Sequence, residues 1–109
     1  MDGYGNNFQL PDSLKEKVSN SMIFNGKRDN KGSPNGGIGI WSPVEPGHGN
    51  MFQTDGVSNF ISKMFGSELS FAKKMTSDGS KVAIIKYSFG GTALYSCAGY
   101  GDWHPDQKK

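Results

Sequence analysis

The chain has 109 residues, about the length of one domain, so a division into two independently folded domains is excluded. Hydrophobic residues make up 34% of the chain, charged residues 20% and glycine 16 positions, which suits a loop-rich globular protein better than a disordered tail. The formal net charge is only +2 and the lysines fall in scattered pairs, so nucleic acid and anionic membranes are poor candidates as partners.

Metal chemistry and membrane insertion are not predicted either. Two histidines and one cysteine, Cys97, have no close spacing, so the sequence predicts no metal site, no cofactor and no internal disulfide. Cys97 is expected to be a small buried thiol. No apolar run reaches the roughly 18 residues of a membrane span, and no signal-peptide pattern is present, which leaves the compartment open.

The first half of the chain is predicted to consist mainly of loops. The opening "MDGYGNN" has the composition of a tight turn, although no strand or helix precedes it in the sequence. One or two helical turns are expected over Leu14–Val18, after Pro11 and the N-cap candidates Asp12 and Ser13, and a short strand over Ser21–Asn25. The stretch Gly26–Gly49 is rich in Gly, Pro and Asn and is expected to be an extended surface loop.

The second half has clearer periodicity. From Ser67, an N-cap candidate, the spacing of Leu69, Ala72 and Met75 predicts an amphipathic helix over Ser67–Met75 that ends before Asp78-Gly79. The apolar run 82–85 then predicts a strand from about Lys81 to Tyr87 that is covered on both faces, as in a parallel sheet. A helix, a short turn and a buried strand in this order indicate an α/β fold.

Two glycines, Gly90 and Gly91, follow this strand. In open α/β sheets ligands bind at the carboxyl ends of the strands, and glycine lets the backbone approach a substrate closely. An equally good interpretation is a turn that ends the strand, with Thr92 as a cap.

These segments resemble a known family. "FGSELSFAKKM" followed by "VAIIKYSFGGTAL" is similar to two ordered blocks of the sialate O-acetylesterase-like carbohydrate esterases of the SGNH hydrolase superfamily. Family members have proline where this chain has Ser67, and they begin with a strand that leads into glycine-glutamine-serine-asparagine-methionine and a glycine-rich loop. "MDGYG" matches the end of that block, and "WSPVEPGHG" resembles the tryptophan-proline loop that precedes the phenylalanine-glycine block. No motif is identified in residues 50–63.

The resemblance implies a partial three-layer SGNH or flavodoxin-like α/β fold with a parallel sheet over residues 1–109. It implies hydrolysis of O-acetyl esters on sugars, such as sialic acid or an acetylated polysaccharide, and a secreted or periplasmic location. The nucleophilic serine would lie two residues before Met1, and the aspartate and histidine would also lie outside the chain. Gly66 would supply an oxyanion N–H, unless it only makes the turn before the helix, and Gly90, Gly91, Thr92 and Trp103 would line the substrate pocket.

Other chemistry-bearing residues are weaker candidates. Asp102 and His104 are separated by two positions, whereas the family's aspartate precedes its histidine by three and lies farther along the chain, so His104 is not expected to be the general base. His48, between two glycines, is a still poorer candidate. Loop aromatics could stack on sugar rings or simply anchor the packing: Tyr4, Trp41, Tyr95, Tyr100 and Trp103.

Two interpretations of function follow from different classes. The first is a part of a carbohydrate acetylesterase that is inactive alone, because the nucleophile and the base lie outside it. The second is a small non-catalytic carbohydrate-binding or interaction module. A strand over 82–88 with parallel neighbours would favour the esterase, and an antiparallel sandwich would favour the binding module.

Overall fold

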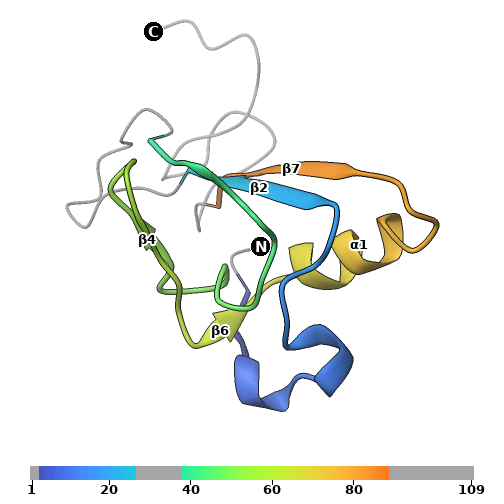
Figure 1. The fold of residues 1–109 in the computed structure, drawn as a ribbon. Coiled ribbons are helices and arrows are strands. Elements are labelled where there is room, and N and C mark those ends of the chain that lie inside the picture. Colours follow the sequence, from blue (N-terminus) through green and yellow to red (C-terminus); the bar gives the residue numbers. More distant parts are fainter. Residues whose placement is uncertain (1–2, 27–37, 89–109) are drawn as a thin grey trace, which may run out of the picture.

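The computed structural model describes residues 3–26 and 38–88 (Figure 1). In these ranges the chain forms short strands, two 3-10 turns and one α-helix. In chain order they are β1 (Gly5–Asn6), η1 (Asn7–Gln9), η2 (Asp12–Leu14), β2 (Ser21–Asn25), β3 (Trp41–Ser42), β4 (Gln53–Thr54), β5 (Asn59–Phe60), β6 (Met64–Phe65), α1 (Glu68–Met75) and β7 (Val82–Lys86).

A three-stranded sheet in the order β3-β2-β7 forms the centre of the described structure. β2 and β7 run parallel, with Ser21 opposite Val82 and Asn25 opposite Lys86, whereas β3 pairs antiparallel with β2. Two further antiparallel pairs, β1 with β6 and β4 with β5, flank this sheet. The fold is therefore mixed α/β, and parallel pairing is limited to the two strands β2 and β7 among the described residues.

The core lies on one face of this sheet, where α1 packs (Figure 1). Ile23 of β2 is fully buried, as are Leu69 and Ala72 of α1, and side chains from the loops complete the cluster: Leu10, Val18 and Val44. Complete burial of a Leu, Ile or Val side chain contributes about 1.5–3 kcal/mol, so this small cluster supplies much of the hydrophobic stabilisation.

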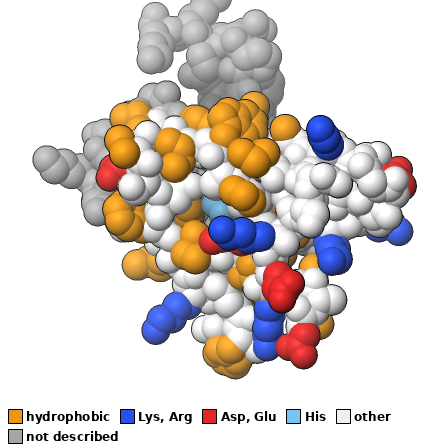
Figure 2. All heavy atoms as spheres, in the orientation of Figure 1, with side chains coloured by type: hydrophobic (Ala, Val, Ile, Leu, Met, Phe, Trp, Pro, Cys, Tyr) orange, Lys and Arg blue, Asp and Glu red, His pale blue; other side chains and the backbone are white. Residues whose placement is uncertain are grey.

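The opposite face of the sheet is open, which contradicts the expectation that β7 is covered on both faces. Ile85 is 76% exposed and Ala83 is also exposed, while Val82 and Ile84 point toward the core. The reason is the period of two along a strand: α1 covers one face, and alternate residues of the apolar run point away from it. Apolar side chains also gather on the upper part of the surface in Figure 2.

Two local predictions are confirmed. β2 has the predicted bounds, and α1 begins one residue after Ser67 and ends at Met75. Ser67 occupies the predicted N-cap position, but it has helical backbone angles and its side chain makes no capping hydrogen bond. The turn after α1 contains Gly79 at φ +87°, a conformation that favours glycine.

Two other predictions are wrong. Instead of a helix over Leu14–Val18, the chain makes one 3-10 turn at Asp12–Leu14 and then extends, because Val18 enters the core and its N–H donates to the carbonyl of Val44 (2.8 Å). The predicted surface loop over Gly26–Gly49 contains β3, and Val44 and His48 within it are buried. Its backbone can leave water because it finds partners, such as the Ser21 hydroxyl that accepts from the Val44 N–H (3.2 Å).

The open face of the sheet leads to a stability prediction. Ile23→Ala removes a fully buried side chain and should lower the free energy of unfolding by about 2–5 kcal/mol. Ile85→Ala, on the other face of the same sheet, is the matched control and should change it by less than about 0.5 kcal/mol. Urea denaturation of both variants measures the difference. Equal losses would mean that both faces of the sheet are covered.

Candidate functional site

The surroundings of Gly66 bring together segments that lie far apart in the sequence. β1 pairs with β6, which places Gly5 opposite Phe65, and Gly3 lies directly against Gly66. Gly3 has φ +89°, and a Cβ on it would collide with the Gly66 Cα and the Phe65 carbonyl oxygen. The Gly3 carbonyl accepts from the N–H of Asn50 (2.7 Å). The opening glycine loop therefore packs tightly onto the turn before α1.

The N–H of Gly66 already has a partner. It donates to Glu68 Oε1 (3.1 Å), whereas the oxyanion role implied by the resemblance needs this N–H to point at the substrate. Gly66 is not among the described glycines with positive φ. A Cβ here would overlap Glu68 Oε2 and lie 2.9 Å from Lys86 Nζ, so a side chain would have to displace the ends of this buried pair. A side chain at this position should therefore lower stability whether or not Gly66 takes part in catalysis.

A buried ion pair lies beneath Gly66. Lys86 Nζ, at the end of β7, is 3.0 Å from Glu68 Oε2, in the first turn of α1, and the two side chains are 9% and 4% exposed. Lys86 Nζ also donates to the carbonyl of His48 (2.6 Å). Buried charges are tolerated when they are paired and hydrogen-bonded, and both conditions are met for this pair.

His48 extends this polar cluster toward β2. Its Nδ1 lies 3.3 Å from Asn25 Nδ2, which also contacts the His48 carbonyl oxygen (3.5 Å), and its ring stacks on Phe52 at 4.8 Å. Because the amide nitrogen can only donate, Nδ1 acts as acceptor and the proton of the neutral ring is on Nε2. Burial lowers the pKa of His48 to about 4, against a raising effect of Glu68 and a further lowering by Lys86.

We call Asn25, His48, Glu68 and Lys86 the buried polar cluster. His48 in it is neutral at neutral pH, but its one basic nitrogen, Nδ1, already accepts from the Asn25 amide, and no carboxylate orients the ring as it would orient a general base. A cavity of about 360 Å³ opens beside the cluster, where the carboxyl end of β7 meets the start of α1. Its walls carry polar and apolar groups: Ser67, Glu68, Phe71, Ile84, Ile85, Lys86, Tyr87 and Ser88.

The structure leaves several predicted site residues untested. Gly90, Gly91, Thr92 and Trp103 lie outside the described residues, as do Tyr95, Cys97, Tyr100, Asp102 and His104. Tyr4 is 73% exposed, and Trp41 is 48% exposed with its ring 5.7 Å from that of Phe24. Within residues 3–26 and 38–88, no group of side chains could hold a metal ion and no helix is long and apolar enough to cross a membrane.

Sequence reasoning missed the buried polar cluster, although a signal for part of it exists. Lys86 is in phase with Val82 and Ile84, and Asn25 is in phase with Ile23, so strand alternation points both polar side chains toward the core. The partners that neutralise them come from the helix and from a loop, and no local pattern identifies those.

Comparisons of this chain with family models, curated proteins and solved structures found no match.

The depressed pKa of His48 predicts a pH-dependent stability. Well above pH 6.5, the ordinary pKa of histidine, both the folded and the unfolded state hold a neutral His48 and its contribution to stability is complete. Between pH 6.5 and about 4 the unfolded state gains a proton that the folded state does not, so stability falls as pH falls. The expected loss is at most about 3 kcal/mol.

Urea denaturation between pH 4.5 and 7 measures this slope. His48→Gln should lower the overall stability and flatten the pH dependence in this window, since the titrating group is gone while an amide can still meet Asn25. An unchanged slope in His48→Gln would assign the dependence to other groups and contradict a buried neutral His48.

Proposed function

We propose that the chain is part of a serine-type carbohydrate O-acetylesterase, with a substrate such as an acetylated sialic acid or polysaccharide. The observation that carries the proposal is the packing of Gly3 against Gly66. By the resemblance, Gly3 belongs to the end of the nucleophile block and Gly66 to the block of the oxyanion hole. A working esterase needs these two blocks side by side, because the serine and the oxyanion donors must reach the same carbonyl group.

The strand arrangement gives further support. β7 pairs parallel with β2, which favours the esterase over an antiparallel binding module. The cavity beside Glu68 lies at the carboxyl end of β7, where ligands bind in open α/β sheets. Parallel sheets are normally covered on both faces, so the exposed face around Ile85 is the kind of surface that a three-layer domain would cover.

The proposed reaction follows the serine-esterase scheme. The serine hydroxyl attacks the acetyl carbonyl, a histidine takes its proton, and the sugar hydroxyl leaves with a proton returned by that histidine; water then releases acetate. Gly66 would donate to the negative oxygen of the tetrahedral intermediate. For this its N–H must be shared with, or released by, Glu68 Oε1, which holds it at 3.1 Å. Glu68 therefore controls whether the donor is available.

The proposal predicts where activity resides. The 109-residue chain alone should hydrolyse p-nitrophenyl acetate no faster than its heat-denatured control, because the serine and the histidine of the scheme lie outside it. A longer polypeptide carrying the in-frame residues on both sides should turn over, and replacing the serine two positions before Met1 with alanine should abolish that activity. Initial rates on p-nitrophenyl acetate and on an acetylated sugar measure both.

Either of two results would reject the proposal. One is a longer in-frame sequence without glycine-glutamine-serine-asparagine before Met1. The other is esterase activity of the 109-residue chain itself that is lost when one of its own serines is replaced.

A further inference from the structure

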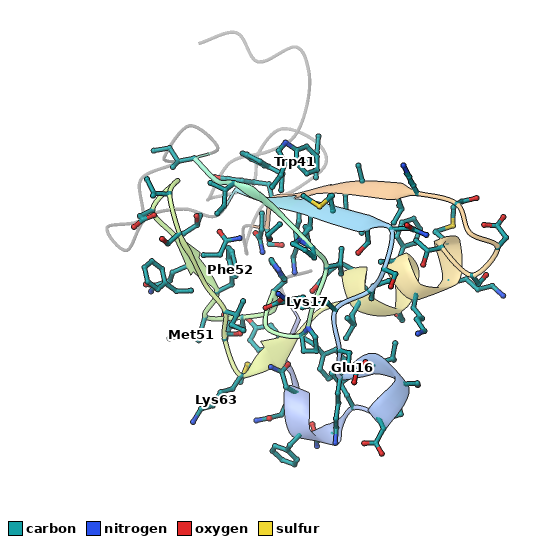
Figure 3. All side chains as sticks on the ribbon, viewed as in Figure 1. Glu16, Lys17, Trp41, Met51, Phe52 and Lys63 are labelled. Carbon is teal, nitrogen blue, oxygen red and sulfur yellow. The ribbon has the colours of Figure 1, made fainter. Side chains whose placement is uncertain are left out.

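A second and larger hollow lies on the other side of the helix. It has a volume of about 770 Å³ and runs between residues 13–20, which connect η2 to β2, and the C-terminal half of α1 with Thr76 and Ser77. Figure 3 labels Glu16 and Lys17 on its first wall. It shares no lining residue with the cavity beside Glu68, so it is a separate feature, which we call the lysine groove.

The first wall of the lysine groove is held in place by the core. Val18 is buried, donates its N–H to the Val44 carbonyl (2.8 Å) and accepts the Ser21 hydroxyl (2.6 Å). The carbonyl of Asn20 accepts the N–H of Val82 (2.9 Å), which ties the end of this wall to the start of β7. The backbone of this wall is therefore fixed before any ligand arrives, whereas the lysine side chains of the groove are exposed and would be ordered by the ligand.

The charges of the groove are unbalanced. Three lysines line it, Lys17, Lys73 and Lys74, against one carboxylate, Glu16. Lys17 is 3.7 Å from Glu45, but neither Lys73 nor Lys74 pairs with a carboxylate within the described ranges. Three ammonium groups on the walls of one concave surface raise the local potential and attract an anion.

Hydroxyl groups beside the lysines add a second kind of recognition. The side-chain hydroxyls of Thr76 and Ser77 donate to the helix carbonyls of Ala72 (2.9 Å) and Lys74 (2.8 Å). Their protons are thus committed, and each oxygen keeps lone pairs that can accept from a ligand hydroxyl. These bonds also satisfy carbonyl groups at the end of α1, which could otherwise accept hydrogen bonds from the lysine ammonium groups in place of a ligand.

We infer that the lysine groove binds a small hydroxylated anion, namely a sugar that carries a carboxylate or a phosphate. Its anionic group would meet Lys73 and Lys74, and its hydroxyls would donate to Thr76 and Ser77. The volume suits one or two sugar units and lies in the usual range of small-molecule sites. The inference stands independently of the esterase, since it uses none of the residues assigned to that site.

Titration of the ¹⁵N-labelled 109-residue chain with glucuronate, glucose 6-phosphate and neutral glucose tests the inference by NMR. At least one of the two anions should cause saturable chemical-shift changes at the amides of Lys73, Lys74 and Ser77. The affinity should be lower at high salt, and neutral glucose should cause no such changes. The stronger of the two anions identifies the preferred acidic group. In the double variant Lys73→Gln/Lys74→Gln the dissociation constant should rise at least about fivefold.

The double variant Lys63→Gln/Lys81→Gln removes the same charge outside the groove and should bind as the unmodified chain does. Three results would overturn the inference: no saturable shift with either anion, equal binding of glucose, or an equal loss of affinity in the control variant. Retained amide dispersion in both double variants shows that they are folded, so that a loss of binding is not a loss of structure.

Discussion

The ion pair between Glu68 and Lys86 is the interaction on which the rest of the described structure depends. It joins the first turn of α1 to the end of β7, and through the second bond of Lys86 it holds the His48 carbonyl. The other carboxylate oxygen of Glu68 takes the Gly66 N–H. A buried charge that loses its partner costs several kcal/mol, so separating these groups would strongly destabilise the fold.

Close packing around the turn at Gly66 explains why glycines lie near the ion pair. The turn at Gly66 runs directly above the ion pair, and Gly3 and Gly49 close around it; an added Cβ would meet neighbouring backbone at Gly3 and Gly49, and the ion pair itself at Gly66. The site proposed for ester hydrolysis thus lies next to a buried ion pair. The Glu68 carboxylate, which holds Gly66 in place, would compete with the substrate oxygen for the Gly66 N–H. Structure and proposed catalysis make opposite demands on Glu68.

The sequence predicted the elements whose signals are local. β2, α1 and β7 follow from apolar spacing of two or of three to four, and their positions are correct to within a residue. The predictions that were wrong concern features that depend on residues far away in the sequence. The burial of His48 requires Asn25 and Phe52, and the exposure of Ile85 depends on which face of the sheet α1 covers. At the site, the resemblance pointed to Gly66, but it gave no indication that Glu68 would occupy its N–H.

The most direct test of this account is to remove one partner of the buried pair and follow individual amides. In Lys86→Met, the free energy of unfolding should fall by about 3–5 kcal/mol, because the Glu68 carboxylate is left buried without its counter-charge. Native-state hydrogen exchange should show Gly66 and Asn50 losing protection beyond that global loss, whereas Asp55, bonded to Ser58 in the β4–β5 hairpin, should lose no more than the global amount. Unchanged stability, or unchanged protection at Gly66 and Asn50, would contradict the central place given to the Glu68–Lys86 pair.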